Sequence, residues 1–347
     1  MKVLIYADPH WSSTSSILRQ RGRQYSIRLE NLISSINWVE QLAKKNECEK
    51  IICLGDFFDK DVLNSEELTA LKEVDFSENI PHVYLCGNHE MGGSSGLYSS
   101  AFAVGLLGDY IYRGVVSYPV CEYLKDCVFC YLPYIRESDR SSLSEYIDNS
   151  INKKVIVFSH NDIKGIYYGK IKSETGFDVE DIKNSCDLYF NGHIHNGGKI
   201  GDKIVNVGNL TGQNFNEDAE VYKHGIYILN TYDLSYEYIQ NPYALNFYKL
   251  DMTARDSFPT FSNAVVSLQC YEEHVEEYKR MLENDPNVLS FRVVTIAPTK
   301  QSDMINKTEL DKMLSNSLDH LGQFRKYVVE NIGSTKMISE ELVEVLK

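Results

Sequence analysis

The sequence has no long apolar run, and this absence excludes a common class of protein. A transmembrane helix needs roughly 18–20 consecutive apolar residues, and no stretch of the 347-residue chain approaches that length. The apolar start of the chain, Met1–Ala7, is too short for a signal peptide and leads straight into Asp8, so we interpret it as a buried strand. Internal repeats and low-complexity segments are absent too. We therefore expect a cytoplasmic globular protein with no membrane partner.

Basic residues are scarce as well. The chain has 35 Lys and Arg residues against 49 Asp and Glu residues, which gives a formal net charge of −14. A protein that binds DNA without a partner must neutralise the DNA phosphates, so it is usually basic. The acidic balance therefore argues either against nucleic acid as a ligand or for a partner protein that supplies the grip.

The eight cysteines do not form a recognised zinc pattern. Cys127 and Cys130 make one C-x-x-C pair, but no second Cys or His pair lies at zinc-site spacing. Cys53, Cys86, Cys127 and Cys130 lie in apolar, strand-like runs, where a reduced cysteine behaves as a small hydrophobic residue. We expect reduced cysteines and no structural zinc.

The first two thirds of the sequence alternate short strands with helices. The expected buried strands, each ending at a polar cluster, are Lys2–Ala7, Lys50–Leu54, His82–Cys86, Lys154–Ser159 and Asp187–Asn191. Apolar residues at helical spacing predict a helix over about 25–45, and a second helix follows with Ser65 as its expected N-cap. This alternation predicts an α/β fold with a partly parallel sheet.

A second group of strands lacks long helices between its members, and we interpret it as the antiparallel-leaning half of a two-sheet sandwich. These strands are Asp126–Leu132, Lys203–Val207, Gly225–Asn230 and Ser235–Ile239. A small α+β region follows, with a strand, a helix and a strand at Ala264–Gln269, Glu272–Glu283 and Leu289–Ile296.

The end of the chain predicts helices. Apolar residues recur at helical spacing from Leu310 to Val328, and a short second helix follows Ser339. This stripe suits either a docking surface or ordinary core packing. Because the chain exceeds the usual size of one core, we divide it into a main domain (1–245), a small α+β capping domain (246–300) and a C-terminal helical segment (301–347).

Histidines gather directly after the predicted strands, where ligands bind in open α/β sheets. The motifs are Asp8-Pro9-His10, Gly55-Asp56-Phe57-Phe58-Asp59, Gly87-Asn88-His89-Glu90, Ser159-His160 and Gly192-His193-Ile194-His195. Each motif alone has an ordinary interpretation as a turn or a structural histidine. Together they supply Asp, Asn and His ligands without a thiolate, a set that suits manganese, iron or zinc at a hydrolytic site.

The order of these motifs resembles that of the calcineurin-like metallophosphoesterases. The resemblance implies a four-layer sandwich, with two mixed β-sheets flanked by helices. It implies that one divalent metal ion is held by Asp8, His10, Asp56 and His195. It implies that a second ion is held by Asp56, Asn88, His160 and His193, so that Asp56 bridges the pair. Two such ions, about 3.5–4 Å apart, activate a shared water and clamp the attacking and leaving oxygens of a phosphoester.

Other residues receive roles from the same resemblance. His89 is expected to stabilise the transition state or to protonate the leaving oxygen, and Asp59 to orient a ligand histidine. Glu90 is either functional or structural. Phosphoprotein phosphatases of this superfamily also carry two arginines that bind the substrate phosphate in bidentate fashion. Cys86 and Lys60 occupy those positions here, so we do not expect a phosphoprotein phosphatase.

Further features resemble the SbcD-type nuclease subunit of double-strand-break repair complexes. These are the Phe57-Phe58 pair, the segment Tyr131–Tyr134, the small domain at 264–296 and the C-terminal helices. The chain departs from that family around His10, where Pro9 and Trp11 are unusual, at Asn209, and at Glu90, where Asp is commoner. These departures put the loop conformation near the substrate in question, although every ligand is retained.

This second resemblance implies a metal-dependent DNA nuclease, a double-strand exonuclease and single-strand endonuclease of recombination, repair and end processing. The expected ion is Mn²⁺, with Mg²⁺, Fe²⁺ or Zn²⁺ as alternatives. The implied partners are DNA and an SbcC-type ABC/SMC ATPase that binds the C-terminal helices, with a nuclease homodimer inside a heterotetramer. The short chain is typical of a phage version, which acts in the host cytoplasm.

Support for DNA from the residues themselves is modest. Arg19, Arg21 and Arg23 follow His10 at alternate positions and are candidates to contact a phosphate backbone; a solvated loop is the alternative. Four residues that follow His160 are candidates to line the substrate cleft, with the same alternative of a solvated loop: Tyr167, Tyr168, Lys170 and Lys172. Two other functions remain open, a phosphodiesterase or nucleotidase for small nucleotides and a non-catalytic scaffold of the ATPase complex.

Overall fold

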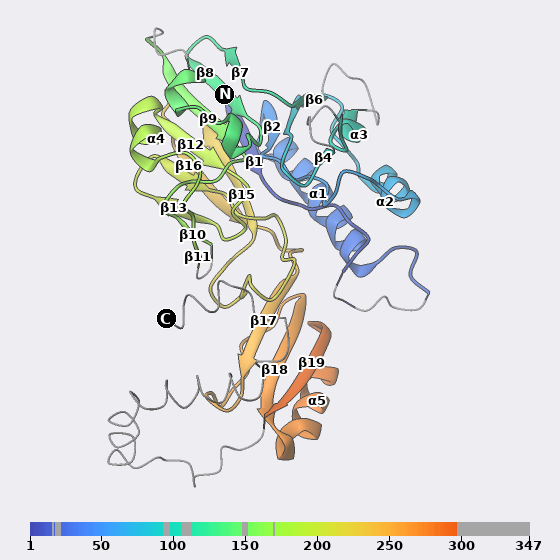
Figure 1. Ribbon diagram of the computed structural model, residues 1–347. Coiled ribbons are helices and arrows are strands. Elements are labelled where there is room, and N and C mark those ends of the chain that lie inside the picture. The colour runs from blue at the N-terminus through green and yellow to red at the C-terminus, as the bar shows by residue number, and fades with distance from the viewer. Residues whose placement is uncertain are drawn as a thin grey trace, which may run out of the picture. The chain divides into compact units, whose positions relative to one another are not determined.

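The computed structural model describes residues 1–15, 17, 22–92, 98–105, 113–147, 152–168 and 171–296 (Figure 1). They belong to one compact unit that ends at Ile296. The predicted C-terminal helices, including the apolar residues from Leu310 to Val328, lie outside the described residues. No helix within the described ranges is long and apolar enough to cross a membrane.

Two six-stranded sheets form the main part of this unit. The first contains β1 (Lys2–Tyr6), β2 (Lys50–Cys53), β3 (His82–Leu85), β6 (Arg113–Val116), β15 (Gly225–Asn230) and β16 (Tyr236–Gln240), in the order β16-β15-β1-β2-β3-β6. The second contains β7 (Val120–Tyr123), β8 (Cys127–Leu132), β9 (Lys154–Ser159), β12 (Leu188–Asn191), β13 (Gly198–Ile200) and β14 (Ile204–Asn206), in the order β13-β14-β12-β9-β8-β7.

Helices and short hairpins connect these strands. The α-helices are α1 (Ile27–Lys45), α2 (Ser65–Ala70), α3 (Phe102–Gly105) and α4 (Val179–Ser185). The 3-10 helices are η1 (Leu71–Glu73), η3 (Glu137–Asp139) and η4 (Leu143–Glu145). Two hairpins pair β4 (Met91–Gly92) with β5 (Tyr98–Ser99) and β10 (Tyr167–Tyr168) with β11 (Ile171–Lys172).

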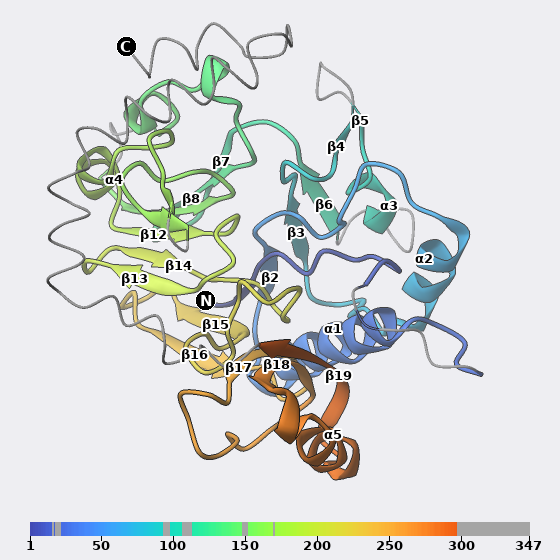
Figure 2. The same ribbon diagram turned by 60° about the horizontal axis from the view of Figure 1, so that its bottom comes forward.

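Three apolar clusters hold the layers together. Ile52 and Phe158 belong to the cluster between the two sheets. Leu32 and Ile36 of α1 pack on the outer face of the first sheet, and Ile182 of α4 packs on the outer face of the second. Each such buried side chain contributes about 1.5–3 kcal/mol. Figure 2 shows α1 and α4 on opposite sides of the sheets. The predicted α/β class and four-layer sandwich are therefore confirmed.

The assignment of strands to the sheets corrects our prediction. We group β15 and β16 with β8 and β14 from sequence, but β15 pairs antiparallel with β1 in the first sheet and β16 pairs with β15. Conversely, β9 and β12 lie in the second sheet, each with parallel partners. An apolar run indicates that a strand is buried, but it does not say which strand lies beside it.

The predicted starts of the first two helices lie close to the observed ones, and one predicted N-cap is wrong. α1 begins after Ser26, whose side chain accepts a hydrogen bond from the Leu29 N–H as a helix N-cap. The N-cap of α2 is Asn64 rather than Ser65, because Asn64 and Glu67 bond each other's backbone N–H groups in a capping box.

One cysteine prediction is wrong. Cys130 forms a disulfide with Cys121 rather than staying reduced. β7 and β8 are antiparallel neighbours, and their register sets Cys121 directly opposite Cys130, with their Cα atoms 4.2 Å apart. Cys127, the other half of the C-x-x-C pair, is a free and buried thiol. The cross-strand register, which the sequence alone does not reveal, decides the pairing.

A three-stranded parallel sheet follows the sandwich. It contains β17 (Asn246–Asp251), β18 (Ala264–Tyr271) and β19 (Val288–Ile296), with η5 (Glu272–His274) and α5 (Val275–Asn284) between the last two strands. The strand, helix and strand expected after residue 263 are thus present, and β17 is an additional strand. The boundaries that we place at 245 and 300 stay a prediction.

Candidate metal centre

The motif residues lie at the carboxyl ends of neighbouring strands. Asp8 and His10 follow β1, Asp56 follows β2, and Asn88 and His89 follow β3, three parallel neighbours of the first sheet. His160 follows β9, and His193 and His195 follow β12, its parallel neighbour in the second sheet. The two sheets therefore contribute their strand ends to one place, as ligand sites in α/β sheets usually require.

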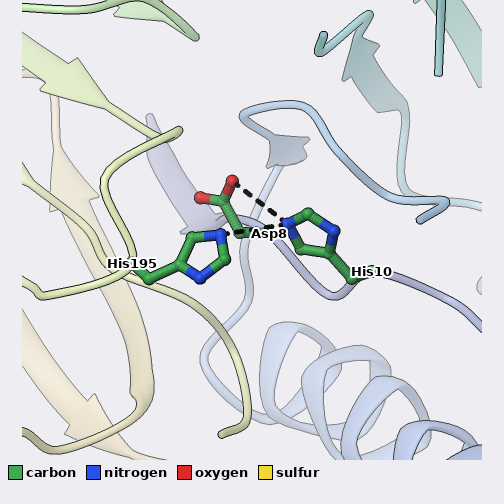
Figure 3. Close-up of side chains that lie close together, drawn as sticks. All are labelled: Asp8, His10 and His195. Atoms are coloured by element: carbon green, nitrogen blue, oxygen red, sulfur yellow. Dashed lines mark hydrogen bonds and ion pairs between the residues drawn. The ribbon is translucent and has the colours of Figure 1, made fainter. Parts of the chain in front are cut away.

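The first group of side chains comprises Asp8, His10 and His195, whose potential ligand atoms all lie within 4.8 Å of one another. The Nε2 atoms of His10 and His195 are 3.1 Å apart, and Asp8 Oδ1 lies 3.9 Å from His10 Nε2. Figure 3 shows the two rings pointing toward one another beside the Asp8 carboxylate. Asp8 and His10 are buried, whereas 25% of the His195 side chain is exposed.

The second group comprises Asp56, His160 and His193, again with potential ligand atoms within 4.8 Å. His160 Nε2 lies 3.2 Å from Asp56 Oδ2 and 3.1 Å from Asn88 Oδ1. Asp56 Oδ2 is also 3.7 Å from His10 Nε2 of the first group. Asp56 therefore lies between the two groups, the location of a bridging carboxylate.

The hydrogen bonds of the first group test whether its residues fit a metal ion. His10 Nδ1 lies 3.1 Å from Asp59 Oδ1, and His195 Nδ1 lies 2.9 Å from Glu217 Oε1. A carboxylate accepts hydrogen bonds, so each neutral ring carries its proton on Nδ1 and presents a lone pair at Nε2. Two lone pairs that face each other across 3.1 Å repel unless a cation lies between them. The first group therefore fits a bound metal ion.

The second group follows the same arrangement with different acceptors. His160 Nδ1 bonds the backbone carbonyl of Leu54 at 2.7 Å, and His193 Nε2 lies 3.2 Å from Asp162 Oδ1. Ligand histidines in metalloproteins commonly bond a carboxylate or carbonyl through the ring nitrogen that does not touch the metal. In both groups, one nitrogen of each histidine is engaged in this way.

The backbone around the centre is strained. Asp8, His10, Asp56 and His193 all adopt positive φ angles, 50°, 48°, 47° and 69°. For residues other than glycine this left-handed region is uncommon and costs of order 1–3 kcal/mol, and such residues cluster at functional sites. Packing that overcomes this cost fixes the side chains in place before a ligand binds.

Gly87 makes one close approach possible. A Cβ atom at this position would lie 2.0 Å from Asp56 Oδ1 and 2.4 Å from the Asp56 backbone nitrogen. Asp56 Oδ1 also accepts a hydrogen bond from the backbone N–H of His89 at 2.9 Å. The Gly87 backbone therefore packs directly against the central carboxylate, which only glycine permits.

The charges of the centre shift its pKa values. Burial disfavours the ionised form of Asp56, but the neighbouring His160 and His10 outweigh burial and hold the pKa of Asp56 below its usual range. Burial also disfavours the charged form of His160, but Asp56 and Asp8 raise the pKa of His160 to about 9. Because metal ligands must be deprotonated, a bound cation would displace this proton.

Glu90 holds two loops of the centre together through hydrogen bonds to their backbone. Its buried carboxyl group accepts hydrogen bonds from the backbone N–H groups of Phe58 and Gly87 at 3.0 and 2.8 Å. Burial and the charge of Asp56 raise the pKa of Glu90 to about 8. Glu90 thus ties the loop after β2 to the loop after β3, a structural role.

His89 and the described DNA-contact candidates are more exposed than the buried residues of the two groups. The His89 side chain is 44% exposed, its Nδ1 bonds the carbonyl of Asp59 at 3.0 Å, and its ring lies edge-on to His10 at 4.7 Å. Arg19 and Arg21 lie outside the described residues. Arg23 pairs with Glu30 of α1, and 62% of Tyr167 is exposed.

Three residues of the centre escaped the sequence analysis: Glu217, Asp162 and Arg28. Glu217 bonds His195 from the middle of the loop between β14 and β15, well beyond the end of the predicted strand Lys203–Val207, so no strand-end signal marked it. Asp162 comes two residues after His160, and its spacing would have been a usable signal. Arg28, in the first turn of α1, donates hydrogen bonds to carbonyl groups of the ligand loops.

The comparisons with known proteins establish the family. The family model of calcineurin-like phosphoesterases matches residues 1–197, more than half of the sequence, and the chain belongs to this family. Membership makes it a phosphoester hydrolase with a dimetal centre. The Asp and His groups described above are able to bind such ions.

The chain is also similar to solved structures, at low identity and low TM-score. An archaeal phosphodiesterase is 15% identical, with 69% of this chain and 99% of that chain covered and a TM-score of 0.36. A dimetal phosphatase from Danio rerio is 14% identical, with 69% and 98% covered and a TM-score of 0.39. The nuclease MPE of Pseudomonas putida is 16% identical, with 51% and 72% covered and a TM-score of 0.26. No curated protein matches the sequence.

Proposed function

We propose that this phosphoesterase is a Mn²⁺-dependent DNA nuclease of the SbcD type, acting in the cytoplasm with an SbcC-type ABC/SMC ATPase. The observation that carries the proposal is the pair of side-chain groups joined by Asp56, built from every motif of a two-metal phosphoesterase. Two ions held by these residues would supply an activated water and would neutralise the charge on the phosphoester oxygens.

The surroundings of the centre favour a phosphodiester over a phosphomonoester. A monoester phosphate carries up to two negative charges, and phosphoprotein phosphatases hold it with two arginines. Here Cys86 is buried, and the Lys60 ammonium lies 3.1 Å from Glu67. The Asp162 carboxylate, 21% exposed beside His193, lies 3.8 Å from the Arg140 guanidinium, so that cation is already engaged by a carboxylate. A diester, with one charge and no free terminal phosphate, fits this acidic site better.

His89 is the candidate proton donor to the leaving sugar oxygen. Among the five motif histidines it has the most exposed side chain, and its Nδ1 is engaged by the Asp59 carbonyl. This contact orients the ring and leaves Nε2 as the nitrogen that transfers a proton.

The net charge of −14 explains why a partner belongs to the proposal. An acidic nuclease binds DNA weakly by itself, with steep salt dependence. We propose that residues 301–347 dock on the ATPase, that the nuclease acts as a homodimer within a heterotetramer, and that the partner supplies most of the DNA grip.

The test is cleavage of end-labelled double-stranded DNA by the purified chain with Mn²⁺, against a His193→Ala control. Metal-dependent release of label by the unaltered chain alone supports a nuclease. Hydrolysis of bis-p-nitrophenyl phosphate without DNA cleavage, repeated with the ATPase present, would contradict it. Hydrolysis of mononucleotides without DNA cleavage would favour the small-nucleotide phosphodiesterase, which the acidic charge of the chain suits without a partner.

A further inference from the structure

Arg28 is a buried cation that contacts the backbone of the loop carrying Asp8 and His10. It is the second residue of α1, only 5% exposed. Its Nη2 donates hydrogen bonds to the carbonyl groups of Pro9 and His10, both at 3.1 Å, and its Nη1 donates to the carbonyl of Gly212 at 3.2 Å. One guanidinium therefore joins the loop after β1, which carries Asp8 and His10, to the loop that leads toward Glu217.

The loop with Gly212 holds the partner of His195. Glu217 Oε1 lies 2.9 Å from His195 Nδ1, and Glu217 Oε2 accepts from Asn209 Nδ2 at 2.9 Å and from the Gln213 N–H at 2.8 Å. Gln213 Nε2 also donates to the carbonyl of Asp8 at 3.2 Å. Any movement of this loop relative to Asp8 and His10 would therefore move His195.

Two carboxylates balance the buried charge of Arg28. Burial lowers the pKa of the guanidinium, and Asp59 and Glu217 oppose that shift. These are the carboxylates that accept from the outer nitrogens of His10 and His195. An uncompensated charge of either sign is costly in a protein interior, so the cation and the two carboxylates depend on each other.

We propose that Arg28 is a positioning residue for one of the two metal positions, the one formed by Asp8, His10 and His195. Its guanidinium holds the two loops in register, so that the Nε2 atoms of His10 and His195 meet at 3.1 Å. The inference rests on the metal-ligand assignment of the proposed function. It adds a residue that coordinates nothing itself.

The histidine side chains of the second position are oriented by other acceptors, although the backbone N–H of His193 also donates to the Asp8 carboxylate at 3.0 and 3.1 Å. His160 forms a hydrogen bond with the carbonyl of Leu54, and His193 forms one with the Asp162 carboxylate. Neither acceptor belongs to the loops that Arg28 bonds. Removal of Arg28 should therefore weaken one metal position and leave the other intact, an asymmetry that a general loss of packing would not produce.

The experiment is a titration of the purified full chain with MnCl₂, in which electron paramagnetic resonance reports free Mn²⁺. We expect two bound equivalents for the unaltered chain. For Arg28→Met we expect one equivalent of unchanged affinity and a second weakened by about 10–100-fold, the usual effect of losing a residue that supports a ligand. Arg28→Lys should act in the same direction, because an ammonium cannot fork across three carbonyl groups.

Lys50→Met is the matched control. Lys50 is also a buried cation, with its Nζ 2.7 and 2.6 Å from the Glu122 carboxylate, but it lies at the opposite end of β2 from Asp56. Its loss should lower the thermal midpoint and leave both manganese equivalents unchanged. The control separates a buried cation that supports the fold from one that supports the metal position.

Two results would overturn the inference. One is unchanged binding of both equivalents by folded Arg28→Met, and the other is equal weakening of both. Arg28→Lys decides the question in the same assay if Arg28→Met does not fold. Because no DNA is present, a failure of this kind leaves the nuclease proposal standing. Fewer than two equivalents in the unaltered chain would instead overturn the ligand assignment itself.

Discussion

The two groups of the centre are oriented by different chemistry. In the first, both outer histidine nitrogens face carboxylates, Asp59 for His10 and Glu217 for His195. In the second, one histidine, His193, faces a carboxylate, Asp162, whereas His160 bonds the neutral carbonyl of Leu54. A carboxylate raises the basicity of the histidine that it binds, whereas a carbonyl mainly fixes the ring. The difference indicates unequal affinities, with the first group binding its ion more tightly.

The largest expected effect comes from removing the charge of Asp56, which lies between the two groups. Asp56→Asn keeps the shape of the side chain but removes the charge that both positions share, so cleavage should fall at least about 1,000-fold. Phosphodiesterase assays with bis-p-nitrophenyl phosphate measure this, and circular dichroism checks the fold. Turnover within tenfold of the unaltered enzyme would rule out Asp56 as the bridge.

A glycine substitution should disturb the same carboxylate through sterics alone. Gly87→Ala introduces a Cβ at 2.0 Å from Asp56 Oδ1, and a displacement of about 1 Å at a catalytic site costs about 100-fold in rate. Gly198→Ala is the matched control, since a Cβ there meets nothing within 4 Å. Equal rates for the two variants would show that the centre tolerates the shift.

The carboxylate partners test the comparison directly. Glu217 is 3% exposed and forms hydrogen bonds with four groups besides its charge contact with Arg28, whereas Asp162 is 21% exposed. Glu217→Gln should weaken one manganese equivalent by about 100-fold and Asp162→Asn by about tenfold. Calorimetric titration with MnCl₂ measures both. The reverse order would mean that burial of the partner does not decide the affinity.

A further effect is expected from pH. The pKa of His160 is raised to about 9, so below that pH a proton competes with the metal for the ring. Manganese affinity at the second group should therefore rise about tenfold per pH unit up to about 9 and then level off. The same titration over about pH 6.5–9.5, which spans the pH at which His160 loses its proton, gives the slope. A flat profile would mean that His160 is already neutral.

The local patterns that sequence analysis used were reliable where a residue's neighbours along the chain decide its role. Apolar runs such as Lys154–Ser159 marked strands correctly, since burial on both faces of a sheet selects them. The polar residues after those runs marked the centre, because ligands bind at the carboxyl ends of the strands in α/β sheets. The placement of β15 and β16 escaped, since it depends on pairing with β1 across more than two hundred residues.

The sequence by itself determined the α/β class and the strand-end motifs with Asp8, Asp56 and His193, because these follow from periodicity and from residues close together along the chain. Only the tertiary structure decided that Arg28 lies beneath His10, that Glu217 holds His195, and that Cys121 meets Cys130. The physical reason is that these contacts join loops and strands whose relative positions arise from packing of the whole sandwich, for which no local pattern carries a signal.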